Sequence, residues 1–265
     1  MLTFGSLFAG IGGFDLGFER AGMECRWQVE IDPFCRKVLA KHWPNVRRYK
    51  DVREVGKHNL EAVDVICGGF PCQDISLAGQ RAGLEGRRST LWTEFARTIG
   101  EIKPQWVVAE NVRGLYSSDD GWFFSKILQD LAGLGYNAEW DCLSAAFFGA
   151  PQLRHRVFII AYPQGNNGGS LGLPHIFTQD KSDLANNWRS SSKGTWNGVW
   201  IDRKRPTTYT ANFPEPLFLR VDNGISIELD KEQAAGRMKQ AGNAVVPQVA
   251  EWIGRRIVEV EDGHP

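Results

Sequence analysis

The sequence predicts an α/β fold built around a largely parallel sheet, in one large domain or a domain with a small appendage. Over the first 160 residues, short apolar runs alternate with amphipathic stretches of helical length, as in strands joined by crossover helices. The length of 265 residues suits one large domain. A composition of 42% hydrophobic and 23% charged residues is typical of a globular chain with a packed core.

Each predicted element rests on a local pattern. Short apolar runs predict strands, and the amphipathic stretches between them predict helices. Gly135 stands where the fourth helix should stop, and Pro247 suits the first turn of the last helix. In chain order the predicted strands are Thr3–Leu7, Arg26–Glu30, Val63–Cys67, Gln105–Ala109, Glu139–Leu143 and Val157–Tyr162, and the predicted helices are Phe14–Ala21, Pro33–His42, Leu91–Ile102, Phe123–Leu134 and Val245–Val258.

The character of the sequence changes after Tyr162. From Pro163 onward, a stretch rich in glycine and asparagine is followed by polar residues mixed with Trp188, Trp196 and Trp200. Neither the helical nor the strand period is sustained there. This part is therefore predicted to be a loop-rich insertion or a small, irregular second domain.

The cysteines and the apolar runs disfavour several classes of protein. Five cysteines without a repeated spacing make a poor disulfide framework, and no Cys-x-x-Cys pair suggests a structural zinc. We therefore expect no metal site. The N-terminus lacks the basic start and cleavage site of a signal peptide, and the apolar runs are far shorter than the roughly 20 residues of a membrane span. A cytoplasmic protein with no membrane partner is expected.

A glycine-rich turn follows the first predicted strand and opens the first helix. Glycines allow a tight turn and a close approach of the backbone to a ligand, while the helix N-terminus supplies donors. Such a turn is often only tight packing. Glu30 ends the second strand, however, where an acid can accept hydrogen bonds from ribose hydroxyls, and this favours a nucleoside cofactor. The spacing is not Gly-x-Gly-x-x-Gly, which disfavours a nicotinamide cofactor. The turn comprises Phe8, Ala9, Gly10, Ile11, Gly12 and Gly13.

Cys72 has the setting of an exposed nucleophile. It lies beyond the Val63–Cys67 strand, after two glycines and a proline, where a doubly wound sheet places its ligands. Such a position can expose a thiolate, whereas an isolated cysteine is usually a small buried hydrophobe. Cys67, inside the apolar run, is assigned to the core.

One carboxylate and two arginines are further candidates. Glu110 follows the Gln105–Ala109 strand, where an apolar wall could raise its pKa and make it an acid; a helix cap or an ion-pair partner is the alternative. Arg154 and Arg156 alternate as they enter a strand, so both should point to one face. Two arginines there suit recognition of phosphates or base carbonyls, or form a solvated pair. The residues alone leave these alternatives open.

Five motifs, in this order, resemble those of the cytosine-5 DNA methyltransferase family: FAGIGGF, GGFPCQ, ENV, QLRHR and GNAVVP. The likeness covers about Leu2–Tyr162 and Arg237–Arg256. The sequence resembles a short prokaryotic or phage-type member of the family. It implies a Rossmann-like, mixed, mainly parallel sheet with helices on both faces, plus a small irregular target-recognition domain. By this resemblance, residues 1–162 form the catalytic and cofactor-binding domain, residues 163–236 a reduced target-recognition region, and residues 237–265 a C-terminal helix that returns to the catalytic domain.

The family's activity is methyl transfer from S-adenosyl-L-methionine to carbon 5 of a flipped-out cytosine in DNA, through a covalent Cys adduct. The resemblance implies that Cys72 attacks carbon 6 and that Glu110 is the acid at the N3 and amino edge of the base. It matches Arg156 to the contact with the cytosine carbonyl and Arg154 to support of the site. Two further positions that hold the constellation are Asn111 and Gln152.

S-adenosyl-L-methionine is the cofactor that the resemblance implies. Its methionine side would lie on the glycine-rich turn, its ribose on Glu30 and its adenine on the Asp51-Val52 turn. Ile31 stands where many members have an aromatic residue, so adenine packing is expected to be weaker or merely aliphatic. Other cofactor-pocket positions are Pro71, Leu91, Asn243 and Val245.

Double-stranded DNA is the partner that the resemblance implies. The run Gln73–Trp92 matches the loop that closes over the flipped base, and a basic stretch among the tryptophans is interpreted as the DNA-facing part of the recognition region. The alternative for that stretch is a solvated surface over a tryptophan mini-core. The residues expected to contact nucleic acid are Gln73, Ser76, Arg81, Arg87, Arg88, Arg203, Lys204 and Arg205.

Two other functions stay open: a tRNA cytosine-5 methyltransferase, and a catalytically inactive cofactor-binding module that grips DNA. The presence of Cys72 and Glu110 together with both arginines argues against the inactive module. The sequence has 31 basic and 31 acidic residues. Taken alone, this net charge of zero argues against a protein that binds nucleic acid through an overall positive charge. The basic residues are clustered, however, so DNA binding through one charged face is expected. We expect a monomer, and a restriction endonuclease is a candidate companion.

Overall fold

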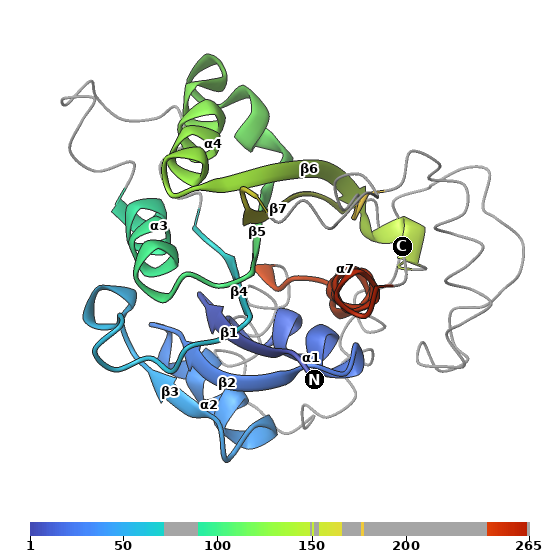
Figure 1. The fold of residues 1–265 in the computed structure, drawn as a ribbon. Helices are drawn as coiled ribbons and strands as arrows, with labels where there is room; N and C mark the ends of the chain where they lie inside the picture. The colour runs from blue at the N-terminus through green and yellow to red at the C-terminus, as the bar shows by residue number, and fades with distance from the viewer. Residues whose placement is uncertain (72–89, 149, 151–153, 166–175, 178–242, 264–265) are drawn as a thin grey trace, which may run out of the picture.

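The computed structural model describes residues 1–71, 90–148, 150, 154–165, 176–177 and 243–263, and the structural statements below concern these residues. Within them, seven strands form one sheet in the order β3-β2-β1-β4-β5-β7-β6 (Figure 1). The strands are β1 (Thr3–Leu7), β2 (Glu24–Val29), β3 (Arg47–Tyr49), β4 (Val65–Gly69), β5 (Trp106–Val112), β6 (Tyr136–Ser144) and β7 (His155–Pro163).

Parallel pairing dominates the sheet. β1 pairs in parallel with β2 and with β4, β2 with β3, and β4 with β5. β7 runs antiparallel to both of its neighbours, β5 and β6. The strand order reverses between β1 and β4, which is where open α/β sheets bind their ligands. The mixed, mainly parallel sheet predicted from the sequence is confirmed.

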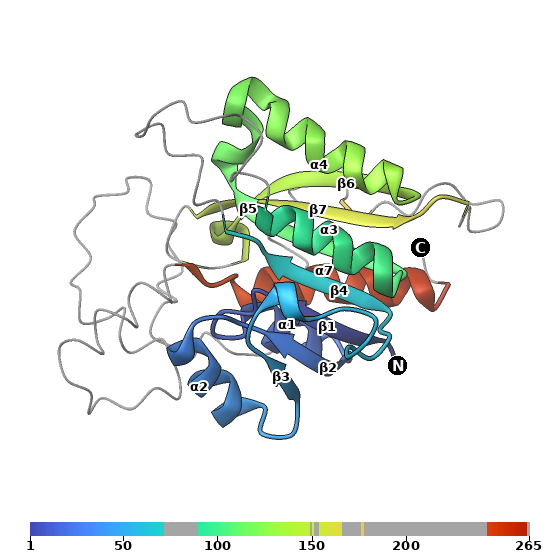
Figure 2. The ribbon, with the colours of Figure 1, turned by 90° about the vertical axis from the view of Figure 1, so that its left-hand side faces the viewer.

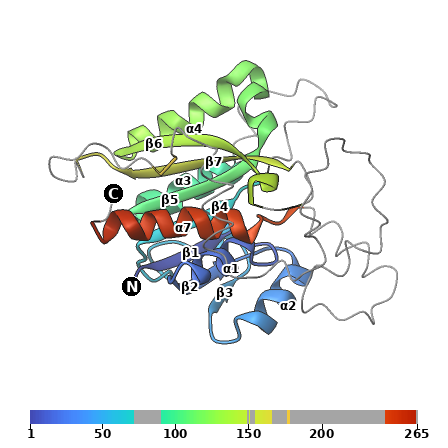
Figure 3. The ribbon, with the colours of Figure 1, turned by 90° about the vertical axis from the view of Figure 1, so that its right-hand side faces the viewer.

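Helices cover both faces of the sheet, as predicted. α3 and α4 lie over one face, where Phe95 and Ile127 join one apolar core (Figure 2). α1 and α7 lie over the opposite face, where Phe14 and Val249 join a second core (Figure 3). No described helix has the length and apolarity needed to cross a membrane. The helices are α1 (Gly13–Arg20), α2 (Pro33–His42), α3 (Thr90–Ile102), α4 (Trp122–Gly133) and α7 (Pro247–Glu261), with 3-10 turns η1 (Val52–Glu54), η2 (Arg113–Gly121) and η3 (Ala145–Phe148).

The structure adds one strand to the prediction and shifts several boundaries. The apolar pattern misses β3 because its residues, Arg-Arg-Tyr, form neither an apolar run nor an alternation. The last helix begins at Pro247 rather than Val245, since the proline takes the first helical position after an extended Val246. Gly135, with a φ of 87°, follows α4 as predicted. The target-recognition region predicted over 163–236 lies almost entirely outside the described residues, so the division into domains stays a prediction.

Close packing of α1 against α7 brings residues from both ends of the chain together. A Cβ on Gly13 would lie 2.2 Å from the carbonyl oxygen of Val245, and one on Gly17 would lie 2.5 Å from that of Pro247. A larger residue at either position would push the two segments apart. The packing therefore places the residues that precede α7 beside the turn that follows β1.

Asp15, a residue of α1, has a buried carboxylate. Its side chain accepts hydrogen bonds from Gln28 Nε2 at 2.8 Å and from Ser6 Oγ at 3.2 Å. Burial raises the pKa of Asp15 to about 6, and the hydrogen bonds offset this effect only in part. The carboxylate also lies in the first turn of a helix that has no side-chain N-cap, where a negative charge is favoured.

The buried Asp15 should make stability depend on pH. Because its pKa is raised from 3.8 to about 6 in the folded protein, the free energy of unfolding should fall as the pH rises through that interval. A shift of about two units corresponds to about 3 kcal/mol. We expect D15N to lose this part of the pH dependence, since Asn keeps the shape and the Ser6 hydroxyl can turn to accept its N–H. Urea unfolding of both proteins between about pH 4 and about pH 7 measures it, and parallel curves would contradict the assignment.

Candidate active site

The predicted site residues that the structure describes gather at one edge of the sheet. β1, β2, β4 and β5 run in parallel, so their carboxyl ends meet there. β7 is antiparallel to β5 and therefore begins at the same edge. The segment before α7 reaches it as well, because Arg154 Nη2 donates a hydrogen bond of 2.7 Å to the carbonyl oxygen of Ala244.

The glycine-rich turn after β1 is held by Glu30. The Gly10 N–H donates to Glu30 Oε2 at 2.7 Å, and the Asp32 N–H donates to Glu30 Oε1 at 2.8 Å. Gly10 has a φ of 57°, and, its two chain neighbours aside, none of the described residues has an atom within 4 Å of the place where its Cβ would stand. The turn therefore presents bare backbone to an open space, as a ligand-binding turn requires. Within it, the Gly12 N–H donates to the Ala9 carbonyl and Ile11 is half-buried.

Burial of Glu30 affects the pKa of its carboxyl group. Glu30 is 9% exposed, and this burial raises the pKa of its carboxyl, while the hydrogen bonds from the two backbone N–H groups lower it. Two hydrogen bonds leave further lone pairs of the carboxylate for a ligand's hydroxyl groups. Ile31, the next residue, is 58% exposed and could cover a flat ligand. These features fit the nucleoside part of a cofactor.

The Asp51-Val52 turn follows β3 at the same edge. The Asp51 carboxylate accepts the Arg53 N–H at 3.0 Å and forms an ion pair of 2.6 Å with Arg53 Nη2. These contacts lower the pKa of Asp51 and fix the start of η1. Val52 is 4% exposed and belongs to the core under α3. The turn is thus built into the fold.

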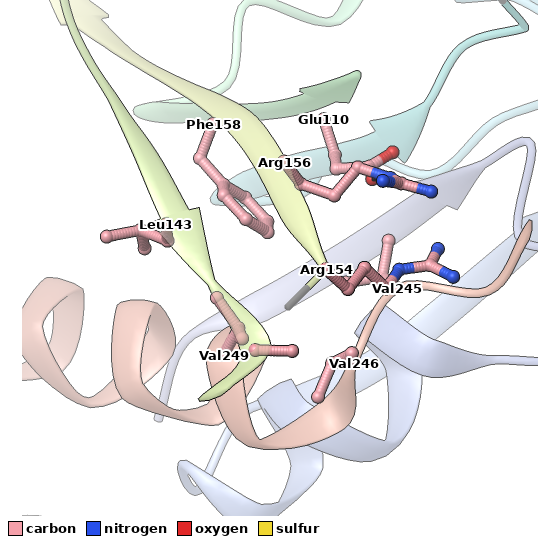
Figure 4. Close-up of a pocket in the computed structure, with 9 residues that line it drawn as sticks. Glu110, Leu143, Arg154, Arg156, Phe158, Val245, Val246 and Val249 are labelled. Carbon is pink, nitrogen blue, oxygen red and sulfur yellow. Dashed lines mark ion pairs between the residues drawn. The ribbon is translucent and has the colours of Figure 1, made fainter. Parts of the chain in front are cut away.

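Glu110 and Arg156 form a buried ion pair. Arg156 Nε lies 3.0 Å from Glu110 Oε1, and the residue Glu110 is 6% exposed. Figure 4 shows the two side chains pointing toward each other. Burial raises the pKa of Glu110 to about 7, although Arg156 and Arg154 both pull it down. The sequence left open whether Glu110 is an acid or an ion-pair partner, and the structure shows it paired with Arg156.

A small cavity lies beside this pair. Its volume of about 10 Å³ has room for about one water molecule. No described residue makes a well-aligned hydrogen bond to Glu110 Oε1, so this buried oxygen can take a polar partner from the cavity side. The lining residues are Glu110, Leu143, Ala145, Arg154, Arg156, Phe158, Val245, Val246 and Val249.

Two side chains position backbone at this edge, and both contacts go beyond what the sequence showed. The Asn111 Nδ2 group donates to the Phe70 carbonyl at 3.1 Å, which holds the chain just before Pro71. Arg154 holds the Ala244 carbonyl, as described above. The partners are main-chain carbonyls, which every residue carries, so no sequence pattern could identify them. Sequence reasoning also missed Gly69, whose Cβ would lie 2.9 Å from Glu110 Oε2.

The remaining predicted residues divide into two groups. Pro71 and Asn243 are exposed, Leu91 is half-buried and Val245 is 9% exposed. The other predicted residues lie outside the described part of the chain, and their roles stay predictions: Cys72, Gln152, Gln73, Ser76, Arg81, Arg87, Arg88, Arg203, Lys204 and Arg205. Cys67 is fully buried, as predicted. Among the described residues, no cluster of three or more His, Cys, Asp or Glu could hold a metal ion.

The fold is that of a Rossmann-like α/β protein, and the described residues predicted for the site gather at the switch point of its sheet. Comparison with known proteins gives the family. Residues 2–217 match the family described as C-5 cytosine-specific DNA methylase. The match spans most of the sequence, and the chain belongs to this family.

Bacterial type II methyltransferases are among the relatives of this chain. M.Eco47II of Escherichia coli is 43% identical over 158 residues, which cover 58% of this chain and 38% of the relative. M.HhaI of Haemophilus parahaemolyticus is 33% identical over 176 residues, covering 66% of this chain and 54% of the relative. This chain therefore matches about half or less of the length of these curated relatives.

A solved structure supports the same fold. It is the crystal structure of a candidate DNA modification methyltransferase encoded within an Escherichia coli prophage. The TM-score is 0.53 at 29% sequence identity, and the likeness covers 62% of this chain and 47% of the other.

Gly69 should control the position of the Glu110 carboxylate. We expect G69A to fold, because the group that its Cβ would meet, Glu110 Oε2 at 2.9 Å, is the end of a side chain that can rotate. The displaced carboxylate should lose its present contact with Arg156, so its pKa should move by about one unit or more from about 7. Carbon-13 NMR titration of labelled Glu side chains measures the shift, with E110Q identifying the resonance.

Gly133→Ala provides the matched control for Gly69→Ala. A Cβ on Gly133 would meet no atom of the other described segments within 4 Å, so this variant should leave the titration of Glu110 unchanged. A Glu110 resonance that titrates alike in G69A, G133A and wild type would show that Gly69 does not set the carboxylate.

Proposed function

We propose that this protein is a DNA cytosine-5 methyltransferase, which transfers a methyl group from S-adenosyl-L-methionine to carbon 5 of a flipped-out cytosine through a covalent adduct with Cys72. The observation that carries the proposal is the Glu110–Arg156 pair, a buried carboxyl with a pKa of about 7. It lies at the sheet edge that also carries the open glycine turn. Membership of the C-5 cytosine-specific DNA methylase family supports it.

The described residues fit S-adenosyl-L-methionine, which supplies an electrophilic methyl group when bound. The turn around Gly10 would accept the methionine part, since nothing in the described structure fills the space beside it. Glu30 would accept hydrogen bonds from the ribose hydroxyls with its remaining lone pairs. Ile31 and the Asp51-Val52 turn would contact the adenine. Pro71, Leu91, Asn243 and Val245 are the other proposed pocket residues.

Glu110 and the arginines would act on the base. Carbon 5 of cytosine is a weak nucleophile, and addition of the Cys72 thiolate to carbon 6 makes it enamine-like. The electron pair that the thiolate displaces collects at N3, where protonated Glu110 can donate a hydrogen bond or its proton. Arg156 lies beside Glu110 and would contact the cytosine carbonyl. After methylation, loss of the carbon 5 proton to a base and elimination of the Cys72 thiolate restore the aromatic ring.

The substrate would be a base removed from the DNA stack. A cytosine inside a duplex cannot expose carbon 6 to a thiolate, so the base must be flipped out. The cavity beside Glu110, about 10 Å³, is far smaller than a base. We therefore propose that segments outside the described residues complete the pocket. The proposed DNA contacts lie in these segments, namely Gln73, Ser76, Arg81, Arg87, Arg88, Arg203, Lys204 and Arg205. A monomeric state, a cytoplasmic location and a companion endonuclease belong to the same proposal.

Methylation in a deficient host tests the proposal directly. We expect that expression of the protein in a methylation-deficient bacterium produces 5-methylcytosine at a short repeated sequence, mapped by bisulfite sequencing of genomic DNA. Cys72→Ala should abolish the signal because it removes the nucleophile, while binding of S-adenosylhomocysteine to the purified variant persists. Methylation confined to tRNA would favour the tRNA enzyme, and no methylation with wild-type cofactor binding would favour an inactive module.

The protonation of Glu110 should appear in the pH–rate profile. Because Glu110 would act in its protonated form, kcat/KM should fall on the alkaline side with an apparent pKa near 7. We expect E110Q to be slower by about 10²–10⁴-fold, the usual worth of a positioned proton donor. Its alkaline limb near pH 7 should also disappear, since an amide does not titrate there. Initial rates of methyl transfer at subsaturating DNA and saturating S-adenosyl-L-methionine measure both, and the same limb in E110Q would assign the titration to another group.

A further inference from the structure

Arg97 on α3 binds the turn that would hold the adenine. Its Nη2 donates to the carbonyl oxygens of Val52 at 2.9 Å and of Val55 at 2.8 Å. Both acceptors belong to η1 and the residue after it, which lie over 40 positions away in the sequence. The guanidinium therefore spans from the middle of a helix to the main chain of the Asp51-Val52 turn.

The other donors of Arg97 are held on its own helix. Nε donates to Glu94 at 2.7 Å and Nη1 donates to Glu101 at 2.8 Å. The two carboxylates fix the plane of the guanidinium, so the remaining edge faces the two carbonyls in a set direction. A planar, rigid fork loses little freedom when it makes several contacts at once.

Glu101 extends the contact beyond η1. Its Oε2 accepts the backbone N–H of Lys57 at 2.9 Å. A Cβ on Gly56 would lie 2.2 Å from the same oxygen, so the chain at Gly56 lies directly against the carboxylate. Arg97 and Glu101 together thus fasten residues 52–57 to α3.

The same helix contacts two other segments of the proposed pocket. Phe95 packs against Phe8 of the glycine-rich turn, with ring centroids 6.2 Å apart, and against Phe70 at the end of β4, at 6.3 Å. These apolar contacts support the methionine end and the nucleophile strand. At the adenine end, the polar contacts of Arg97 and Glu101 hold the chain in place of such apolar contacts.

We infer that Arg97 is a positioning residue that sets the affinity of the protein for the adenine end of its cofactor. Arg97 itself touches neither the cofactor nor the base. It acts by fixing the Val52 and Val55 carbonyls, and hence the position of the Asp51-Val52 turn. The inference rests on the proposed function, because it takes the edge beside Glu30 as the cofactor site.

The test is calorimetric binding of S-adenosylhomocysteine to wild type, R97M and R97K. Met keeps the apolar stem of Arg97 and removes all of its donors, whereas Lys restores one charged donor. Loss of two charge-assisted contacts to buried carbonyls should raise the Kd of R97M at least tenfold, with R97K between R97M and wild type. The maximal rate at saturating cofactor should stay within about threefold of wild type, because the turn does not contact the base.

Arg255→Met is the matched control. Arg255 lies on α7, is bonded to Glu251 four residues earlier at 2.9 Å, and also contacts a distant carbonyl, that of Arg20 at 3.4 Å. It resembles Arg97 in these contacts but lies away from the proposed pocket, so R255M should bind S-adenosylhomocysteine with the wild-type Kd. Adenosine, measured by competition, should lose affinity for R97M by the same factor as the whole cofactor product, since the effect lies at the adenine end.

The possible outcomes separate the inference from the proposed function. A wild-type protein that binds no S-adenosylhomocysteine would overturn the proposed function and the inference with it. Wild-type binding with an unchanged Kd in folded R97M, or a loss that adenosine does not share, would overturn the inference alone. If R97M fails to fold, E101Q serves instead, because it weakens the contact of Glu101 with the Lys57 N–H, which also fastens this segment to α3. E101Q should raise the Kd about two- to fivefold. An unchanged Kd would again count against the inference.

Discussion

The ion pair between Glu110 and Arg156 constrains most of what surrounds it. A carboxylate that is 6% exposed needs a charged partner, because an uncompensated buried charge costs several kcal/mol. Arg156 supplies that charge because β7 is antiparallel to β5, so the start of one strand lies at the end of the other. In a wholly parallel sheet, the neighbouring strand would begin at the opposite edge. The reversal of β7 is thus what gives this edge a cation.

The glycines of α1 bring the C-terminal segment to the same edge of the sheet. Because Gly13 and Gly17 let α7 approach α1, the segment around Ala244 lies where Arg154 can reach it. The site therefore combines residues from the first and last parts of the sequence. α3 adds a third support, because it contacts the glycine turn through Phe95 and the Asp51-Val52 turn through Arg97.

Much of this arrangement could be predicted from the sequence, and the reason is geometric. Strands joined by helices run parallel, so residues just after each apolar run must meet at one edge, and Glu30 and Glu110 do so. The sequence could not show which main-chain carbonyls Asn111 and Arg154 bind, because backbone acceptors leave no trace in residue identity. It could not show β3 either, since pairing with β2 rather than any apolar pattern makes Arg47–Tyr49 a strand. Nor could it decide the charge of Glu110, which depends on burial against two nearby cations.

The different contacts of the two arginines suit the acid role proposed for Glu110. Each cation in direct contact with a carboxylate stabilises its ionised form and lowers its pKa. Arg154 Nη2 donates a hydrogen bond to the Ala244 carbonyl. Arg156 forms the described ion pair with Glu110. Two bidentate arginines would hold the carboxylate ionised at neutral pH, and no arginine would leave it neutral well above neutrality. The positive charges of Arg156 and Arg154 lower the pKa of Glu110 and burial raises it more, so that it stands at about 7; a carboxyl of this pKa suits the proposed donation of a proton to a bound base.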